Sequence, residues 1–423
     1  MSHCADRNPA SPSDWNRWGM TPPQRVALVA FLFSGAVNSA LLVMPFFLFN
    51  QMNQGATLSG IFIGLASLGY TLASLFSSRF VARARHGLNW SLFGVTGFLI
   101  FLGAMPAFRT PFLCGFFFVA SFTFSAFAWP AYHSWVGAEP FPEARARHMS
   151  LVNVAWSTGG AAGPLLAGPF YEIDFRFPYL FIAGLCLLSL VLIASVPPEK
   201  SYFVCLSSDS TQSRRAHDRA SESFLYSAWC ATFAAHITVG STRAVFPKQL
   251  DELISTGQLR YLWESHASAW LNSASASRFS WLAVIMGLAT GLTFFIMGRS
   301  AWWHHRFSML VVIQLFTGAA MWSLGYTHSI IVMLIAFSAI GMNLGVAFFS
   351  SVFYGMANPT TKHGRAAINE GVVGLGGMTG SLGFAAVGIY AGLNLPFRLM
   401  PLVMIAIILL QWCLIRWRRS GEA

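Results

Sequence analysis

Long apolar runs separated by short polar segments make up most of the chain. Twelve of these runs are close to the length of about 20 residues that a helix needs to cross the hydrocarbon core of a bilayer. The pattern therefore predicts an all-α polytopic membrane protein with twelve transmembrane helices in two sets of six. The first set is expected near residues 26–50, 57–77, 88–107, 112–135, 149–171 and 177–196, and the second near 224–246, 279–298, 307–325, 329–354, 366–391 and 397–416.

Polar stretches divide this pattern. Residues 1–24 are polar and lack the apolar core and small-residue cleavage site of a signal peptide, so we expect the first helix to stay in the mature protein. The chain turns polar and serine-rich between the two sets of helices, as a flexible linker does. We therefore expect an N-terminal six-helix bundle at 1–198, a cytoplasmic linker at 199–223 and a C-terminal six-helix bundle at 224–423.

The segment 365–392 is rich in glycine and contains no proline. In water each helical glycine costs about 1 kcal/mol relative to alanine. In a bilayer a lone apolar segment must satisfy its backbone as a helix, and small residues let neighbouring helices approach closely. We therefore expect a tightly packed membrane helix here. It holds Glu370, the only acidic residue that we place within an apolar span, and a charge at mid-bilayer costs roughly 2.5 to 3.5 kcal/mol.

An internal repeat relates the two halves. The run VNSALLVMP ends at Pro45, and the similar run VGSTRAVFP ends 202 residues later at Pro247. A second pair of similar segments is offset by 217 residues. Such a repeat is typical of transporters built from two related bundles. In the second pair Gly159, Gly160 and Gly163 match Gly376, Gly377 and Gly380, and Asn153 falls where Glu370 falls.

Composition and charge support membrane insertion. Hydrophobic residues make up 55% of the chain and charged residues 10%, which excludes an ordinary soluble protein. The formal net charge of +11 does not indicate nucleic-acid binding, because 19 of the 26 Lys and Arg residues fall on the side of the termini, in the end segments, short loops and linker. By the positive-inside rule, both termini are expected in the cytoplasm, with the protein in the cell (inner) membrane. The six cysteines show no paired spacing, so neither a disulfide framework nor a metal site is expected.

Two motifs carry a resemblance to a known family. The sequence GYTLASLFSSRFVARARHG at 69–87 resembles the loop between helices 2 and 3 of the major facilitator superfamily, with Arg79 and Arg83 in the basic positions. Ser78 stands where that family usually has an aspartate that locks the cytoplasmic gate, so the gate must be held differently here. In helix 5, Gly159, Gly163, Pro164, Ala167 and Gly168 resemble the family's G-x-x-x-G-P-x-x-G-G pattern, which is associated with proton-exchanging exporters.

The resemblance implies a secondary active transporter that moves a small solute by alternating access, with proton-coupled export or uptake both open. The alternative is a non-transporting protein of the same fold that serves as a membrane assembly factor or sensor, and the missing aspartate favours it slightly. No enzyme motif or cofactor motif occurs, so we expect no enzymatic activity. The expected partners are a small-molecule substrate and the lipid bilayer, with the protein a monomer.

Polar and aromatic residues within the spans are the candidates for substrate binding or coupling. Aromatic residues at the end of helix 4 and in helix 5 either line a pocket or anchor the interface. His133 and His148 are expected to be structural. The candidates for binding or coupling are Asn38, Trp129, Tyr132, Asn153, Trp156, His236, Arg243 and Glu370, and those for a cytoplasmic gate are Ser78, Arg79, Arg83, Arg299 and Arg365.

Glu370 and Arg243 each allow two interpretations. Glu370 either holds the gate by pairing with Arg79, Arg83 or Arg299, or carries a coupling proton. Arg243 either extends its side chain to the headgroups near Pro247, or turns into the cavity to bind a carboxylate or phosphate. The second interpretation places His236 on the same helix face, two turns deeper, where it can titrate near neutral pH.

Overall fold

The computed structural model describes residues 19–83, 87–139, 141–198, 211–260, 275–357 and 362–420. Throughout this described part the chain is helical, and its only strand-like pairing is an isolated bridge between Arg260 and Ser329. Each of the twelve predicted spans corresponds to a helix or to a pair of consecutive helices. The twelve-helix fold predicted from the apolar pattern is confirmed.

The first half contains six crossings. The fourth crossing is broken between α4 and α5 at Ala126 and Phe127. In chain order the elements are α1 (Pro22–Met52), α2 (Ala56–Arg83), α3 (Asn89–Ala104) with the 3-10 turn η2 (Met105–Ala107), α4 (Pro111–Ser125), α5 (Ala128–Val136), α6 (Pro142–Ile173) and α7 (Phe177–Ala194).

The second half repeats this arrangement, and its fifth crossing contains a π-helical segment between α13 and α14. Helix α9 begins at Thr211, inside the segment expected to be a linker, and continues past Pro247 to Ser255. The elements are α9 (Thr211–Ser255), α10 (Ser275–Arg299), α11 (Phe307–Leu324), α12 (Ile330–Gly355), α13 (Lys362–Met378), η4 (Thr379–Gly383), α14 (Phe384–Ala391) and α15 (Leu395–Ser420).

Ten segments of the described chain are long and apolar enough to cross a membrane. The crossings made by α6 and α9 are the two that do not meet this criterion. Both have long amphipathic or polar stretches, and both face the centre of the molecule, where α6 packs on α1 and α10 and α9 packs on α12 and α13. Their low hydropathy therefore reflects polar faces turned away from lipid.

The repeat seen in the sequence is a repeat of helix contacts. A methyl group on Gly163 of α6 would lie 2.2 Å from the carbonyl oxygen of Gly35 on α1. In the second half, a methyl group on Gly380 would lie 2.3 Å from the carbonyl oxygen of Ile237 on α9. Gly35 and Ile237 are 202 residues apart, and Gly163 and Gly380 are 217 apart. The two offsets of the sequence repeat therefore correspond to one close helix–helix contact, which occurs once in each half.

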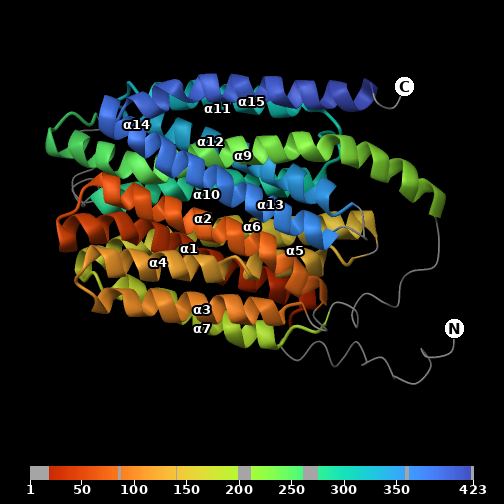
Figure 1. The fold of residues 1–423 in the computed structure, drawn as a ribbon, viewed down its shortest axis with the longest axis horizontal. Helices are drawn as coiled ribbons and strands as arrows, with labels where there is room; N and C mark the ends of the chain where they lie inside the picture. Colours follow the sequence, from red (N-terminus) through yellow and green to blue (C-terminus); the bar gives the residue numbers. More distant parts are fainter. Residues whose placement is uncertain are drawn as a thin grey trace.

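The two halves lie side by side along the long axis of the molecule, the first half below and the second above in Figure 1. They meet along two seams, α6 against α10 and α2 against α13 and α14. Glycines bring the helices together near both ends of each seam. The contacts are Gly168 with Ser280 and Gly298 with Ser150 in the first seam, and Gly60 with Ala385 and Gly371 with Leu75 in the second. Both seams are therefore in close contact near both of their ends.

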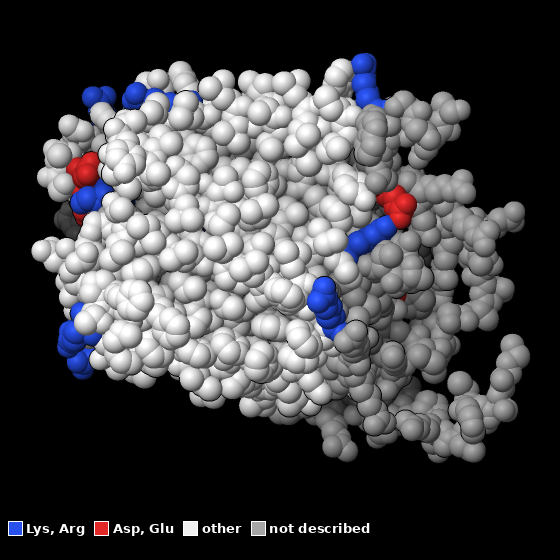
Figure 2. Space-filling model, in the orientation of Figure 1, with Lys and Arg blue, Asp and Glu red and all other residues white. Residues whose placement is uncertain are grey.

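Charged side chains gather toward the two ends of the molecule on the face shown in Figure 2, and the middle of that face is free of them. Large apolar side chains such as Leu180 and Leu292 are more than half exposed on the outer faces of the helices. An exposed apolar band between two charged ends is the surface expected of a protein that spans a bilayer.

The close α1–α6 pair predicts a strong effect of a small substitution. We expect Gly163→Ala to lower the melting temperature of the purified protein in detergent, because the new methyl group overlaps the Gly35 backbone. Overpacking of this kind costs about 1 to 3 kcal/mol. Gly184→Ala is the matched control, since Gly184 has no atom within 4 Å of its added methyl group. Equal melting temperatures for the two variants would contradict the close contact.

Candidate functional site

A cavity of about 140 Å³ lies where the two halves meet. Helices α1, α2, α4, α5 and α6 line it from the first half, and α9, α12 and α13 line it from the second. A second cavity of about 50 Å³ adjoins the first. It lies toward those ends of α1 and α9 that are farther from the two chain termini. Both cavities share the lining residues Asn38, Leu41, Trp156, Val239, Arg243 and Leu344.

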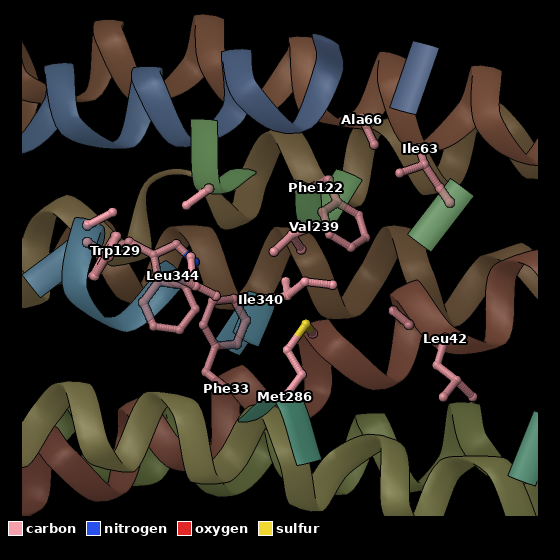
Figure 3. Close-up of a cluster of buried hydrophobic side chains, with 14 of the residues drawn as sticks. Phe33, Leu42, Ile63, Ala66, Phe122, Trp129, Val239, Met286, Ile340 and Leu344 are labelled. Carbon is pink, nitrogen blue, oxygen red and sulfur yellow. The ribbon is translucent and has the colours of Figure 1, made fainter. Parts of the chain in front are cut away.

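Most of the cavity wall is apolar. Figure 3 shows Ile63, Ala66 and Phe122 of the first half converging with Val239 and Leu344 of the second half. All five of these residues line the larger cavity. Polar side chains in this setting are therefore few, and each can orient a bound solute.

Arg243 lies in the walls of both cavities. Its Nη2 donates a hydrogen bond to Asn38 Oδ1 at 2.5 Å, across the boundary between the two halves. Asn38 Nδ2 in turn donates to the carbonyl oxygen of Ser34 at 2.9 Å, which turns the amide oxygen toward the arginine. In the described part of the chain, no carboxylate lies within ion-pair distance of Arg243. Arg243 therefore presents a charge without a counter-ion to the cavity.

Of the two interpretations of Arg243, the geometry matches the one in which the side chain turns inward. An arginine that extended to the headgroups would leave the centre of the molecule, whereas Arg243 contacts Asn38 of the opposite half. The corresponding residue of the first half is Leu41, which also lines both cavities. The repeat therefore places one charged and one apolar residue at equivalent positions of the cavity.

Glu370 lies at the other end of the larger cavity, in a cluster of three side chains from three helices. The Tyr70 hydroxyl of α2 donates to Glu370 Oε2 at 2.5 Å. His133 Nδ1 of α5 lies 3.2 Å from Glu370 Oε1, and the two side chains are 6% and 3% exposed. Neither of these two facing atoms has a hydrogen-bond partner. One hydrogen placed between these two atoms would join them in a hydrogen bond.

This environment differs from the expected pairing of Glu370 with an arginine. Arg79 is exposed and lies over the Phe76 ring, 5.9 Å from its centroid. It follows Tyr70 by nine residues, which places it about 13.5 Å further along α2 than the residue that contacts Glu370. The arginine is therefore beyond the reach of the buried carboxylate.

The remaining gate candidates are also separate from Glu370. Arg299 is exposed, and its guanidinium lies 3.6 Å from the centroid of the Phe295 ring. Arg365 pairs with Glu222 of α9. The side chains of Ser78 and Arg83 lie outside the described residues. Any gating role of these five residues stays a prediction.

His236 and Asn153 add polar groups to the larger cavity. His236 Nδ1 lies 2.8 Å from the carbonyl oxygen of Thr232, so this nitrogen carries the proton in the neutral ring and Nε2 is the free acceptor. Asn153 is 2% exposed, and its Nδ2 has no hydrogen-bond partner. By the repeat, Asn153 corresponds to Glu370, so equivalent positions of the two halves again supply polar groups to the same space.

Two of the three aromatic candidates line the cavity. Trp129 and Trp156 do so, and Trp156 stacks on Phe348 with ring centroids 5.2 Å apart. Tyr132 does not line either cavity. Its side chain is 1% exposed and its hydroxyl accepts a hydrogen bond from Ser91 of α3 at 2.6 Å. Tyr132 therefore belongs to the packing of the first half, since it points away from α9 and toward α3.

The sequence did not identify Tyr70 and His133 as partners of Glu370. Tyr70 was noted only as part of the motif between helices 2 and 3, and His133 was assigned a structural role. A single sequence does not show which helices face one another, so partners on α2, α5 and α13 could not be matched. The signal that the sequence did offer was chemical. A glutamate within an apolar span requires hydrogen-bond donors from neighbouring helices.

Comparisons with known proteins agree with this architecture. Residues 26–204 match the family model described as Major Facilitator Superfamily. A search of curated protein sequences found no match. Among solved structures, the human organic anion transporter MFSD10 (TETRAN) superposes with a TM-score of 0.63 at 14% identity, over 93% of this chain and 100% of that chain.

The proton:xylose symporter XylE, solved with bound 6-bromo-6-deoxy-D-glucose, superposes with a TM-score of 0.67 at 12% identity, over 93% of this chain and 95% of that chain. These likenesses extend the shared fold across both halves. The first half of the chain thus matches the family model, and both halves together have the fold of these two membrane transporters.

Proposed function

We propose that this protein is a secondary active transporter that carries a small organic anion, by alternating access of the two six-helix bundles around Arg243. The observation that carries the proposal is the unpaired guanidinium of Arg243 in the central cavity. Removing a charge from water without a partner is costly, and proteins normally pair or neutralise such groups. A site that keeps an arginine without a carboxylate is therefore completed by an anion from outside.

The contact with Asn38 links anion binding to the relative position of the halves. A neutral amide oxygen is a weaker acceptor for a guanidinium than a carboxylate, whose charge-assisted hydrogen bonds are roughly twice as strong. An entering carboxylate competes with Asn38 for Arg243. Because Asn38 and Arg243 belong to opposite halves, this competition loosens one contact between the bundles at the moment the substrate binds.

The structural neighbours support transport but do not select the solute. MFSD10 is named as an organic anion transporter and XylE as a proton:xylose symporter. The two neighbours therefore carry different classes of solute on the same fold. The choice of an organic anion rests on Arg243, and the name of MFSD10 is consistent with it.

We also propose that Glu370 carries the proton that is coupled to transport. The carboxylate has a tyrosine and a histidine as neighbours and no arginine. A gate residue is expected to sit in an ion pair, whereas a residue that exchanges protons needs neighbours that stabilise both protonation states. The Tyr70 hydroxyl can donate to the charged form, and neutral His133 can accept from the protonated form.

The orientation in the membrane follows from the charge distribution. We infer that the protein lies in the cell (inner) membrane with both termini in the cytoplasm, because most Lys and Arg residues fall on the side of the termini. We also propose that it acts as a monomer. A non-transporting sensor of the same fold is the alternative. It would bind a solute without carrying it, and uptake into liposomes distinguishes the two.

The first prediction concerns the shape of the Arg243 head group. Arg243→Lys keeps the charge and loses the two-pronged guanidinium, so we expect affinity for organic anions to fall at least about tenfold, the effect of losing a hydrogen bond to a charged group. Arg243→Ala should abolish binding. The measurement is thermal stabilisation of the purified protein by a panel of small carboxylates, followed by uptake of the best ligand into liposomes.

Arg176→Lys is the matched control for this series, because Arg176 is exposed in the turn between α6 and α7 and lines neither cavity. It should bind and transport like the unaltered protein. Unchanged transport in both Arg243→Lys and Arg243→Ala would remove Arg243 from the site and with it the proposed class of substrate.

The second prediction uses Asn38 as a built-in competitor. Asn38→Asp places a fixed carboxylate within hydrogen-bonding distance of Arg243, so we expect it to block anion binding while raising the melting temperature of the ligand-free protein. Asn38→Ser removes the amide without supplying a charge and should retain anion binding. Normal anion affinity in Asn38→Asp would show that Arg243 does not bind the substrate.

The third prediction separates coupling from gating. Glu370→Gln removes the exchangeable proton, so we expect loss of uptake driven by a pH gradient while exchange of labelled for unlabelled anion continues. The exposed Glu252→Gln is the control and should retain both activities. If Glu370→Gln instead keeps pH-driven uptake and alters only the balance of conformations, Glu370 is a gate residue.

A further inference from the structure

The volume of the cavity limits the size of what can be carried. Alternating access requires the two halves to close around the substrate. In this conformation the larger cavity measures about 140 Å³. An apolar cavity of about 150 Å³ admits one benzene molecule. The space is therefore that of a single ring.

The walls of this space favour a flat apolar body. Trp129, Trp156, Phe122 and Phe348 line the larger cavity. Trp156 and Phe348 stack face to face, and the Trp129 ring meets the Trp156 ring nearly at right angles, at 85°. Aromatic rings prefer offset-stacked and edge-to-face contacts, so this group offers both a face and an edge to an aromatic guest.

The charges of the walls limit the guest to one negative group. Arg243 is the only lysine or arginine among the residues that line the two cavities. At the other end of the larger cavity stands Glu370, whose carboxylate would repel a second anionic group. One cationic end and one acidic end therefore suit a monoanion and oppose a dianion.

We propose that the substrate is an aromatic monocarboxylate with a single ring, whose carboxylate binds Arg243 and whose ring lies among Trp129, Trp156 and Phe348. This inference rests on the proposed function and narrows its substrate class. The repeat supports the division of roles, because the apolar Leu41 stands at the position equivalent to Arg243 and leaves Arg243 as the only cationic side chain at that end of the site.

The test is a comparison of four probes on the purified protein. Dissociation constants for benzoate, acetate, phthalate and 1-naphthoate are measured in detergent, each against Arg243→Ala as the background. We expect benzoate to bind at least about tenfold more tightly than acetate, the effect of burying a phenyl-sized apolar group. Phthalate should bind more weakly because of its second charge, and 1-naphthoate because its second ring exceeds the cavity.

A cavity-filling variant tests the position of the ring. Val239 is 5% exposed and lines both cavities, so Val239→Phe should weaken benzoate at least about tenfold and leave acetate binding in place. Val191→Phe is the matched control on the outer face of α7, where Val191 is 58% exposed. Phe348→Leu is a second variant that removes a ring without adding volume, and it too should weaken benzoate but not acetate.

The outcomes separate this inference from the proposed function. If acetate or phthalate binds as tightly as benzoate, and the binding is lost in Arg243→Ala, the substrate is an anion and the single-ring aromatic assignment is overturned. If none of the four probes binds in a way that depends on Arg243, both the assignment and the proposed function are overturned.

Discussion

The unpaired charge of Arg243 is the constraint on which the site depends. A guanidinium in the middle of a membrane protein is costly unless its donors find acceptors. Here the acceptor within the protein is a single neutral oxygen, on Asn38 of the opposite half. The fold thus keeps a guanidinium incompletely satisfied at the boundary of the two bundles, which is where the proposed anion would bind.

Glycines allow the helices within each half to pack closely against one another. The α1–α6 and α9–α13 pairs approach so closely that backbone oxygens occupy the space of a β-carbon, at Gly163 and Gly380 among others. In a bilayer, where lipid tails are as apolar as leucine, close van der Waals contact of this kind is a main source of helix association. These close pairs lie within each half, and contacts such as Gly371 with Leu75 join the two halves along the seams.

Much of the architecture could be predicted from the sequence, because membrane helices are long, apolar and repeated. The apolar runs gave the twelve crossings, and the offsets of 202 and 217 residues correspond to equivalent helix contacts in the two halves. The shared face of His236 and Arg243 followed from helical spacing, and both line the larger cavity. The partners of Glu370 did not follow, since spacing within one helix says nothing about which side chain of another helix it meets. Tyr132 shows the same limit: its place on a central helix was predictable, but its turn toward Ser91 was not.

The most direct test of the account is to locate a bound anion in the protein. Crystals grown with 3-bromobenzoate would report the bromine by its anomalous scattering and the carboxylate by its density. The account predicts the carboxylate on the Arg243 guanidinium, in place of Asn38, and the bromine among Trp129, Trp156 and Phe348. Bromine found only outside the cavity, with Arg243 still bonded to Asn38, would contradict it.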